Sequence, residues 1–378
     1  MEKIKIFISG DFAPRLRVKD SILRGDYNSL YNDMLKIIRQ SDYAITNLES
    51  PLTDMVTPIR KTGPNLIAPT KSVEALKCVP FHMVTLANNH AMDQGKQGLK
   101  STINILKEND IDYVGAGLNE EEIKEPRYVN IKGKTIAIIN CCENEWSTML
   151  SEGVGCNPLN DIAIYYQIDK AKRHSDYCIL IIHGGHEMYE LPSPRMVKLY
   201  RWFIDLGVDA VIGHHTHCYC GREVYNGKNI IYSLGNFVFD HPHWKSGAWT
   251  EACACVLEVT DMGIDVQMIP FRQCNDKVGI QLLKSDELQS FTTKDLEKTN
   301  LIQDDERLNQ EFSKYLHNKA NLFEAYIEPI SGKWVLALKK FHVIKSFLSS
   351  KKRLLLLNLI RCESHRDILI NQLKNTSE

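Results

Sequence analysis

The chain has 378 residues, which is enough for one large α/β domain with an appendage or for two domains. Its hydrophobic content of 43%, charged content of 25% and formal net charge of -1 are typical of a soluble globular protein and exclude a broadly basic, nucleic-acid-binding surface. Eleven cysteines, several of them adjacent, indicate reduced thiols rather than a disulfide framework, because no secretory leader is recognisable. No run approaches the ~18–20 apolar residues of a transmembrane helix. We therefore expect a cytoplasmic protein with no integral membrane segment and no nucleic-acid partner, and with a composition compatible with a homo-oligomer.

The first half of the chain alternates strand-like and helix-like segments. Short apolar runs predict strands at residues 3–10, 43–49, 82–86 and 112–116. Helical patterns lie between them at residues 30–38, 72–78 and 99–106. Such alternation predicts an α/β fold in which helices cover the sheet.

The second half repeats this pattern and then changes. Strands are predicted at residues 134–140, 177–182, 210–212, 229–234, 255–259 and 264–269, with a helix at 194–206. After about residue 275 only helical patterns follow, at 284–291, 304–315 and 341–367. We therefore expect one domain over residues 1–275 and a mostly helical C-terminal region over residues 276–378.

Polar side chains recur just after the predicted strands, where open α/β sheets bind ligands. A lone buried histidine is usually structural, but several candidates at successive strand ends favour one shared site. Carboxylate, amide oxygen and imidazole together are the ligands expected for Mn, Fe or Zn rather than Ca. One carboxylate shared by two ions about 3.5–4 Å apart would form the clamp used in phosphoryl hydrolysis. The six candidates are Asp11, Glu49, Asn89, His183, His215 and His217.

The histidine cluster His214-His215-Thr216-His217 has an informative spacing. In an extended segment, residues i and i+2 point the same way, so His215 and His217 can reach a metal centre together. His214 would then point away or form a hydrogen bond to a ligand, although a shift of register would exchange it with His215. Gly213 would allow a close approach of the backbone.

Asn89 and His90 combine metal binding with acid–base chemistry. The asparagine oxygen can bind a metal while His90 protonates a leaving oxygen or stabilises negative charge on a phosphoryl group. Asp93, three residues later, can orient His90. The alternative is a polar turn that opens a helix.

Three further motifs leave alternatives open. The segment His241-Pro242-His243-Trp244 either lines the cleft or forms a surface loop. Cys218 and Cys220 are either zinc ligands or semi-buried thiols, and no CxxC pair accompanies them. The basic stretch at residues 339–366 either touches an anionic membrane surface or packs on protein.

Six segments, in this order along residues 3–270, carry a resemblance to a known family. The chain resembles CapA-type capsule or poly-γ-glutamate synthesis proteins, which are similar in fold to calcineurin-like metallophosphoesterases, a β-sandwich flanked by helices. The matching segments are Gly10-Asp11, Asn47-Leu48-Glu49-Ser50-Pro51-Leu52-Thr53, Leu86-Ala87-Asn88-Asn89-His90-Ala91-Met92-Asp93-Gln94-Gly95, His183-Gly184-Gly185, Gly213-His214-His215-Thr216-His217 and Tyr232-Ser233-Leu234-Gly235-Asn236-Phe237-Val238-Phe239-Asp240.

This resemblance implies two divalent ions held by the six candidates above, with His90 as the catalytic histidine and Asp93 beside it. His214, Asn47 and Asn236 would contact the ligands or the substrate. Two residues depart from the superfamily's usual pattern: Ala13 stands where Asp-x-His would place a histidine, and Glu49 stands for the usual bridging aspartate.

Two functions follow from these observations. The first is a metal-dependent phosphoester hydrolase of capsule or poly-γ-glutamate-type polymer biosynthesis, acting on an anionic or phosphorylated substrate. The alternative is a non-hydrolytic accessory protein that binds an anionic polymer or a phosphorylated intermediate in the same cleft.

Overall fold

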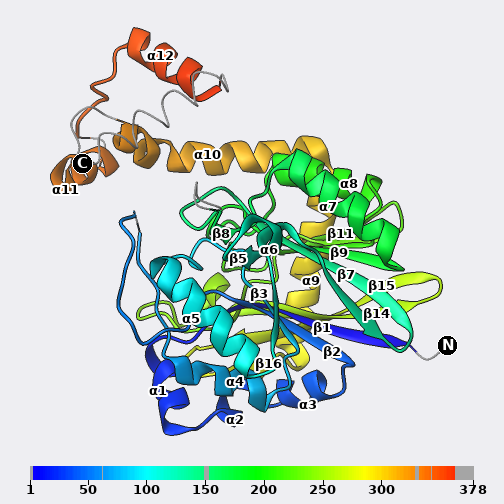
Figure 1. Ribbon diagram of the computed structural model, residues 1–378. Helices are drawn as coiled ribbons and strands as arrows, with labels where there is room; N and C mark the ends of the chain where they lie inside the picture. The colour runs from blue at the N-terminus through cyan, green and yellow to red at the C-terminus, as the bar shows by residue number, and fades with distance from the viewer. Residues whose placement is uncertain (1–2, 62, 149–152, 328–331, 342, 362–378) are drawn as a thin grey trace. The chain divides into compact units, whose positions relative to one another are not determined.

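The computed structural model describes residues 3–61, 63–148, 153–327, 332–341 and 343–361 (Figure 1). The chain divides into two compact units, Met1–Asn309 and Gln310–Glu378, which are described separately below. The division into domains after residue 275 stays a prediction.

The first unit contains an eight-stranded sheet whose strands β1, β2 and β3 lead to three of the predicted metal ligands, Asp11, Glu49 and Asn89. Strands β1 to β4 run parallel, whereas β14 to β16 are antiparallel to their neighbours. β13 (Asn236–Phe239) pairs with β1 beside the main path. The order is β16 (Ile280–Leu282), β15 (Gly263–Gln273), β14 (Glu251–Thr260), β1 (Ile4–Ala13), β2 (Tyr43–Leu48), β3 (Met83–Thr85), β4 (Asp112–Val114).

A six-stranded sheet supplies the histidines. Its inner strands β12, β10, β9 and β7 run parallel, and His183 and His214 are direct partners across β9 and β10. Two short strands, β5 (Ala116–Gly117) and β8 (Gly155–Cys156), pair separately. The order in the six-stranded sheet is β11 (Arg222–Tyr225), β12 (Lys228–Ile231), β10 (Ala210–His214), β9 (Tyr177–His183), β7 (Lys134–Cys142), β6 (Arg127–Ile131).

Apolar side chains of the two sheets form a shared core between them. Ile6 and Ile8 of β1 lie in one buried cluster with Ile138, Ile181 and Ile212 of the second sheet. Burial of each such side chain contributes about 1.5–3 kcal/mol to the free energy of folding. The two sheets therefore pack face to face as a sandwich.

Helices cover the outer faces of both sheets (Figure 1). α7 (Asp161–His174) and α8 (Pro194–Asp205) pack on the second sheet. The first sheet is accompanied by α1 (Leu16–Arg24), α2 (Asn28–Tyr31), α3 (Met34–Arg39), η1 (Thr70–Ser72), α4 (Val73–Cys78) and α5 (Gly95–Glu108). Two further short segments are α6 (Glu120–Lys124) and the 3-10 helix η2 (Gly247–Trp249). The predicted β-sandwich flanked by helices is confirmed.

Local sequence explains where several helices begin and end. The Asn160 side chain accepts a hydrogen bond from the Ala163 amide at the start of α7, and Ser193 caps α8 ahead of Pro194. The single helix predicted at residues 30–38 is instead two, α2 and α3, because Asn32 between them has a φ of 45°.

The C-terminal part is mostly helical, as predicted, but it begins with the strand β16, which pairs with β15 and was not predicted. α9 (Ser285–Ile302) packs on β11, where the Thr299 hydroxyl donates to the Arg222 carbonyl. α10 (Asp305–Ile327) begins in the first unit and continues into the second, which also contains α11 (Lys333–Lys340) and α12 (Ser350–Arg361). The single helix predicted at 341–367 is therefore wrong over residues 343–349, and residues 362–367 lie outside the described part of the chain.

Two predictions about the whole chain can be compared with the structure. The ten cysteines in the described ranges form no disulfide with one another, and their reduced state stays a prediction. No helix in those same ranges is both long enough and apolar enough to cross a membrane.

Candidate metal centre

The predicted ligands meet where parallel strands of both sheets end. Asp11 lies in β1, Glu49 follows β2, His183 ends β9, and His215 and His217 follow β10. The sixth candidate, Asn89, lies in the turn between β3 and α5. All six are buried, with Asp11 and Glu49 wholly inaccessible to solvent. Residues from both halves of the chain are thus brought into one site.

Acids and histidines form two groups in this site that share one carboxylate. The first group is Asp11, Glu49 and His217, and the second is Glu49, His183 and His215. In each group one atom from every residue lies within 4.8 Å of the others, with Glu49 common to both. This is the arrangement that a bridging carboxylate between two ions requires.

The spacing of the second group matches a metal coordination sphere. His183 Nε2 lies 3.6 Å from Glu49 Oε1, 3.1 Å from His215 Nδ1 and 3.0 Å from Asn89 Oδ1. Bonds of about 2.0–2.2 Å to one ion place neighbouring ligand atoms about 3.0–3.5 Å apart. Asn89 therefore belongs with this group.

In the first group the histidine nitrogen lies further from Glu49 than it does in the second group. His217 Nδ1 lies 3.5 Å from Asp11 Oδ2, and His217 Nε2 lies 3.9 Å from Glu49 Oε1. His217 Nδ1 donates to Asn236 Oδ1 at 3.0 Å, which leaves Nε2 as the nitrogen with a free lone pair. A second partner that fixes the tautomer in this way is typical of metal-binding histidines.

Glu49 provides the test of whether a cation fits. Both of its oxygens are buried and have no hydrogen-bond partner among the residues that the structure describes. Burial, and then the charge of Asp11, raise the pKa of Glu49 well above its usual value. An unpartnered buried carboxylate is strongly unfavourable, and a divalent cation would supply the missing partner. The residues present therefore fit a metal ion.

Asp11 is surrounded by donors. Burial by itself would raise its pKa, but the hydrogen bond with His217 and the charge of His183 hold that pKa well below its usual value. Asn47 Nδ2 donates to Asp11 Oδ1 at 2.7 Å, and the His215 amide lies 3.3 Å from Asp11 Oδ2. The Asn47 oxygen accepts from Thr85 at 3.2 Å, so the amide orientation is fixed. Asn47 thus orients a candidate ligand.

The histidine cluster reaches the site differently from the extended spacing that we expected. β10 ends at His214, and His215 and His217 then have φ values of 91° and 59°, in the left-handed region. Each contributes to a different group. His214 Nε2 donates to the Ser9 carbonyl at 3.1 Å and so joins the two sheets below the site. Gly213 is required for close approach, because a Cβ there would lie 2.0 Å from the Tyr232 carbonyl oxygen.

His90 faces the shared carboxylate. Its Nε2 lies 4.0 Å from Glu49 Oε1, and its Nδ1 donates to Asp93 Oδ2 at 2.6 Å. Burial lowers the pKa of His90, while the hydrogen bond with Asp93 opposes that shift. The segment is also a turn, since the His90 amide donates to Asn88 Oδ1 at 3.1 Å. The polar turn ahead of α5 is therefore present, and the acid–base role of His90 stays a prediction.

The structure adds residues that no sequence pattern singled out. Lys61 lies in the irregular segment after β2, forms an ion pair with Asp93 and reaches within 3.3 Å of His90 Nδ1. Trp249 packs against His217, with ring centroids 4.9 Å apart. The only signal for either was its residue type, because both come from segments without periodicity.

The motif His241-Pro242-His243-Trp244 is linked to the site by aromatic contacts. His241 stacks on Trp244 with centroids 4.2 Å apart, and it lies 5.0 Å from Trp249. His243 and Trp244 are exposed. Cys218 and Cys220, in contrast, are buried beside Thr216, and neither joins a three-residue metal cluster in the described ranges.

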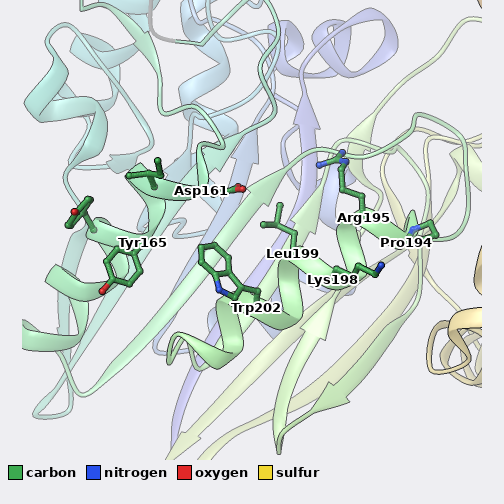
Figure 2. A pocket seen from close by; sticks show the side chains of 9 residues that line it. Asp161, Tyr165, Pro194, Arg195, Lys198, Leu199 and Trp202 are labelled. Carbon is green, nitrogen blue, oxygen red and sulfur yellow. The ribbon is translucent and has the colours of Figure 1, made fainter. Parts of the chain in front are cut away.

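An open groove of about 790 Å³ lies elsewhere, between α7 and α8 (Figure 2). Tyr165 and Trp202 line it together with Leu199, Arg195 and Lys198. None of the candidate metal ligands lines this groove. The chemistry of the site therefore lies at the strand ends and not in the groove.

Comparison with known proteins identifies relatives of the chain. The family described as "Bacterial capsule synthesis protein PGA_cap" matches residues 5–241. The chain is 31% identical over 312 residues to "Capsule biosynthesis protein CapA" of Bacillus anthracis, covering 79% of this chain and 74% of that protein. It is 34% identical over 218 residues to "PGA biosynthesis protein CapA" of Bacillus subtilis (strain 168), covering 56% of this chain and 57% of that protein. A "Probable polyglutamine synthesis accessory protein" of Mycobacterium tuberculosis is 28% identical over 275 residues, covering 65% and 70% respectively.

Solved structures are more distant. A hypothetical protein from Thermus thermophilus aligns over 71% of this chain and 99% of its own, with a TM-score of 0.47 and 14% identity. A putative 5'-nucleotidase from Staphylococcus aureus aligns over 78% of this chain and 58% of its own, with a TM-score of 0.43 and 15% identity. Neither likeness is close enough to support a statement about function.

Proposed function

The chain belongs to the family of bacterial capsule synthesis proteins, and from that premise we propose that it is a metal-dependent phosphoester hydrolase acting in the biosynthesis of a capsule or poly-γ-glutamate-type polymer. Its substrate would be anionic or phosphorylated. The ions would be two divalent cations of the Mn, Fe or Zn class, which matches the mixture of imidazole and oxygen ligands.

The observation that carries this proposal is the position of Glu49. Its carboxylate is buried, has no hydrogen-bond partner in the described ranges, and is common to both groups of candidate ligands. A protein without a use for a cation would not be expected to keep such a group, because burial of an unpaired carboxylate is costly.

The other residues have distinct roles in this proposal. Asp11 and His217 would hold one ion, and His183, His215 and Asn89 the other, with Glu49 between them. Two ions there would supply Lewis-acid polarisation of a phosphoryl oxygen. His90 presents Nε2 toward the shared carboxylate, in reach of a substrate bound beside it. A protonated His90 would donate from Nε2 to the leaving oxygen.

One observation favours a second function, that of an accessory protein that binds an anionic polymer or phosphorylated intermediate without hydrolysing it. Phe12 and Ala13 follow Asp11, so the first group has no fourth side-chain ligand from that motif. The distance between His217 Nε2 and Glu49 Oε1 in this group, 3.9 Å, is also longer than the 3.6 Å between His183 Nε2 and the same oxygen. A loosely held first ion would leave binding intact while reducing turnover.

Metal analysis and a hydrolysis assay separate these functions. The purified chain is stripped with chelator, reloaded with Mn²⁺ and analysed for bound metal, and its hydrolysis of bis(p-nitrophenyl) phosphate is measured. We expect about two ions per chain, metal-dependent hydrolysis, and loss of most activity in Asn89→Ala.

The matched control is Asn130→Ala, an exposed asparagine on β6. Its metal content and activity should equal those of the wild type. A wild-type protein that binds metal but hydrolyses nothing would favour the accessory function. A wild-type protein that binds no metal would contradict the proposed two-ion site.

A further inference from the structure

Lys61 is a buried cation beside the catalytic candidate His90. Its side chain is only 3% exposed, and its ammonium forms an ion pair with Asp93. The same ammonium nitrogen lies 3.3 Å from His90 Nδ1. Burial of a lysine ammonium is costly unless the charge is paired, so this placement requires a reason.

Anchoring of the surrounding segment does not provide that reason. The segment is tied to the turn at Asp93 by the Ile59 amide, which donates to the Asp93 carbonyl at 3.0 Å. The Thr57 amide donates to Gln94 Oε1 at 2.7 Å, and the Thr57 hydroxyl donates to the Gln94 carbonyl at 2.8 Å. None of these bonds involves the Lys61 side chain.

Three nitrogen atoms lie within hydrogen-bond distance of the Asp93 carboxylate. Lys61 donates to Oδ1, while the Leu66 amide donates to Oδ2 at 2.5 Å. His90 Nδ1 lies 2.6 Å from the same Oδ2. Because Lys61 and the Leu66 amide both use Asp93 as an acceptor, we take the contact with His90 in the same sense, with the proton on Nδ1. Lys61 and His90 are then both donors, and the 3.3 Å between their nitrogens is proximity rather than a hydrogen bond.

We propose that Lys61 is a positioning residue that locks Asp93 as the acceptor for His90 Nδ1–H, so that the imidazole presents Nε2 to the shared carboxylate Glu49. Lys61 acts on one Asp93 oxygen and His90 on the other, so the lysine fixes the plane of the carboxylate that the imidazole contacts. The consequence for turnover rests on the proposed hydrolase function, whereas the orientation of His90 does not.

The test reads the ring of His90 directly. In metal-free protein labelled with ¹⁵N-histidine, long-range ¹H–¹⁵N spectra report which ring nitrogen carries the proton, and His90→Gln identifies the signal. We expect a single Nδ1–H form with a slowly exchanging proton in the wild type. In Lys61→Met that proton should exchange at least tenfold faster and a second tautomer should appear, and Lys61→Arg should restore most of the wild-type signal.

Control variants separate positioning from stability. Lys96→Met alters an exposed lysine next to the same turn and should leave the His90 signal unchanged. If Lys61→Met does not fold, Lys61→Ala, which also removes the donor, takes its place. A wild-type-like His90 signal in a folded Lys61→Met or Lys61→Ala protein would overturn the proposal, whatever the thermal stability.

Turnover gives an independent reading. With Mn²⁺-loaded protein and bis(p-nitrophenyl) phosphate, Lys61→Met should lower kcat at least tenfold and leave KM within about twofold, because positioning acts on His90 rather than on substrate binding. Equal kcat in Lys61→Met and wild type would count against the role. If the wild type hydrolyses nothing, the proposed hydrolase function fails. The NMR result alone then shows whether Lys61 positions His90.

Discussion

Glu49 Oε1 and His183 Nε2 lie 3.6 Å apart, although the two residues come from different sheets of the sandwich. Neither Glu49 oxygen has a hydrogen-bond partner in the part of the chain that the structure describes. A buried acid that faces a histidine in this way is suited to a cation between them, and that geometry leads to the first prediction.

Metal should stabilise the protein through Glu49. Ligand that binds only the folded state at 100 times its dissociation constant adds about 2.7 kcal/mol to the free energy of unfolding. We expect Mn²⁺ to raise the melting temperature of the wild type and to have little effect on Glu49→Gln. Because burial raises the pKa of Glu49, the metal-free Glu49→Gln protein should be at least as stable as the wild type. Differential scanning fluorimetry measures both effects. Glu74→Gln, at a half-buried glutamate on α4 remote from the site, is the control, and an equal metal response in Glu49→Gln would contradict the shared site.

Asn236 should affect the metal affinity of the first group, Asp11, Glu49 and His217, and not that of the second. It accepts from His217 Nδ1 and donates to the His217 and Trp249 carbonyls. Loss of such a partner typically lowers metal affinity by about 10–100-fold. Isothermal titration of Asn236→Ala with Mn²⁺ should therefore show one site weakened and the other unchanged. Uniform weakening of both sites would mean that Asn236 acts on the fold instead.

Acid should destabilise the metal-free protein through those buried histidines whose pKa is lowered. Burial lowers the pKa of His214 below 6.5, so below that pH the unfolded chain binds a proton that the folded chain does not. Its contribution to stability is thus present above pH 6.5 and is lost as the pH falls. Urea unfolding in chelator at pH values of about 7.0 and 5.5 should show a fall in the free energy of unfolding of up to about 1.4 kcal/mol per pH unit from this residue.

His214→Gln isolates that contribution. The glutamine keeps a donor near the Ser9 carbonyl but does not titrate. The difference between the two pH values should become smaller in this variant, although the buried His183 and His215, whose pKa values are also lowered, still contribute. An unchanged difference would show that His214 is already protonated in the folded protein.

Gly213 should tolerate no side chain. A Cβ there would lie 2.0 Å from a backbone oxygen of Tyr232, an atom that cannot move without displacing the strand. We expect Gly213→Ala to lower the free energy of unfolding by about 2–3 kcal/mol or more and to weaken Mn²⁺ binding, since His214 and His215 follow directly. In Gly133→Ala the Cβ would enter open space, so only the strain of its φ of 82° applies, about 1–2 kcal/mol. Equal urea midpoints for the two variants would contradict the close contact.

Much of the fold was predictable from the sequence because it depends on local patterns. Apolar runs identified the parallel strands of both sheets, and the turn residues at their ends marked where ligands lie. The split of the helix at residues 30–38 was missed, because a left-handed residue such as Asn32 leaves no periodic signal. The same limit applies to His215 and His217, whose extended spacing suggested one shared target.

What the sequence determined by itself is the set of side chains at the strand ends, because strand length and burial follow from residues that are neighbours in the chain. What only the tertiary structure decided is how those side chains combine. Glu49 faces both His183 and His217 because the two sheets pack face to face, with His214 hydrogen-bonded across them to Ser9. Lys61 reaches Asp93 because its segment folds back on the turn after β3. These pairings depend on the register and packing of elements far apart in the chain, which local patterns do not encode.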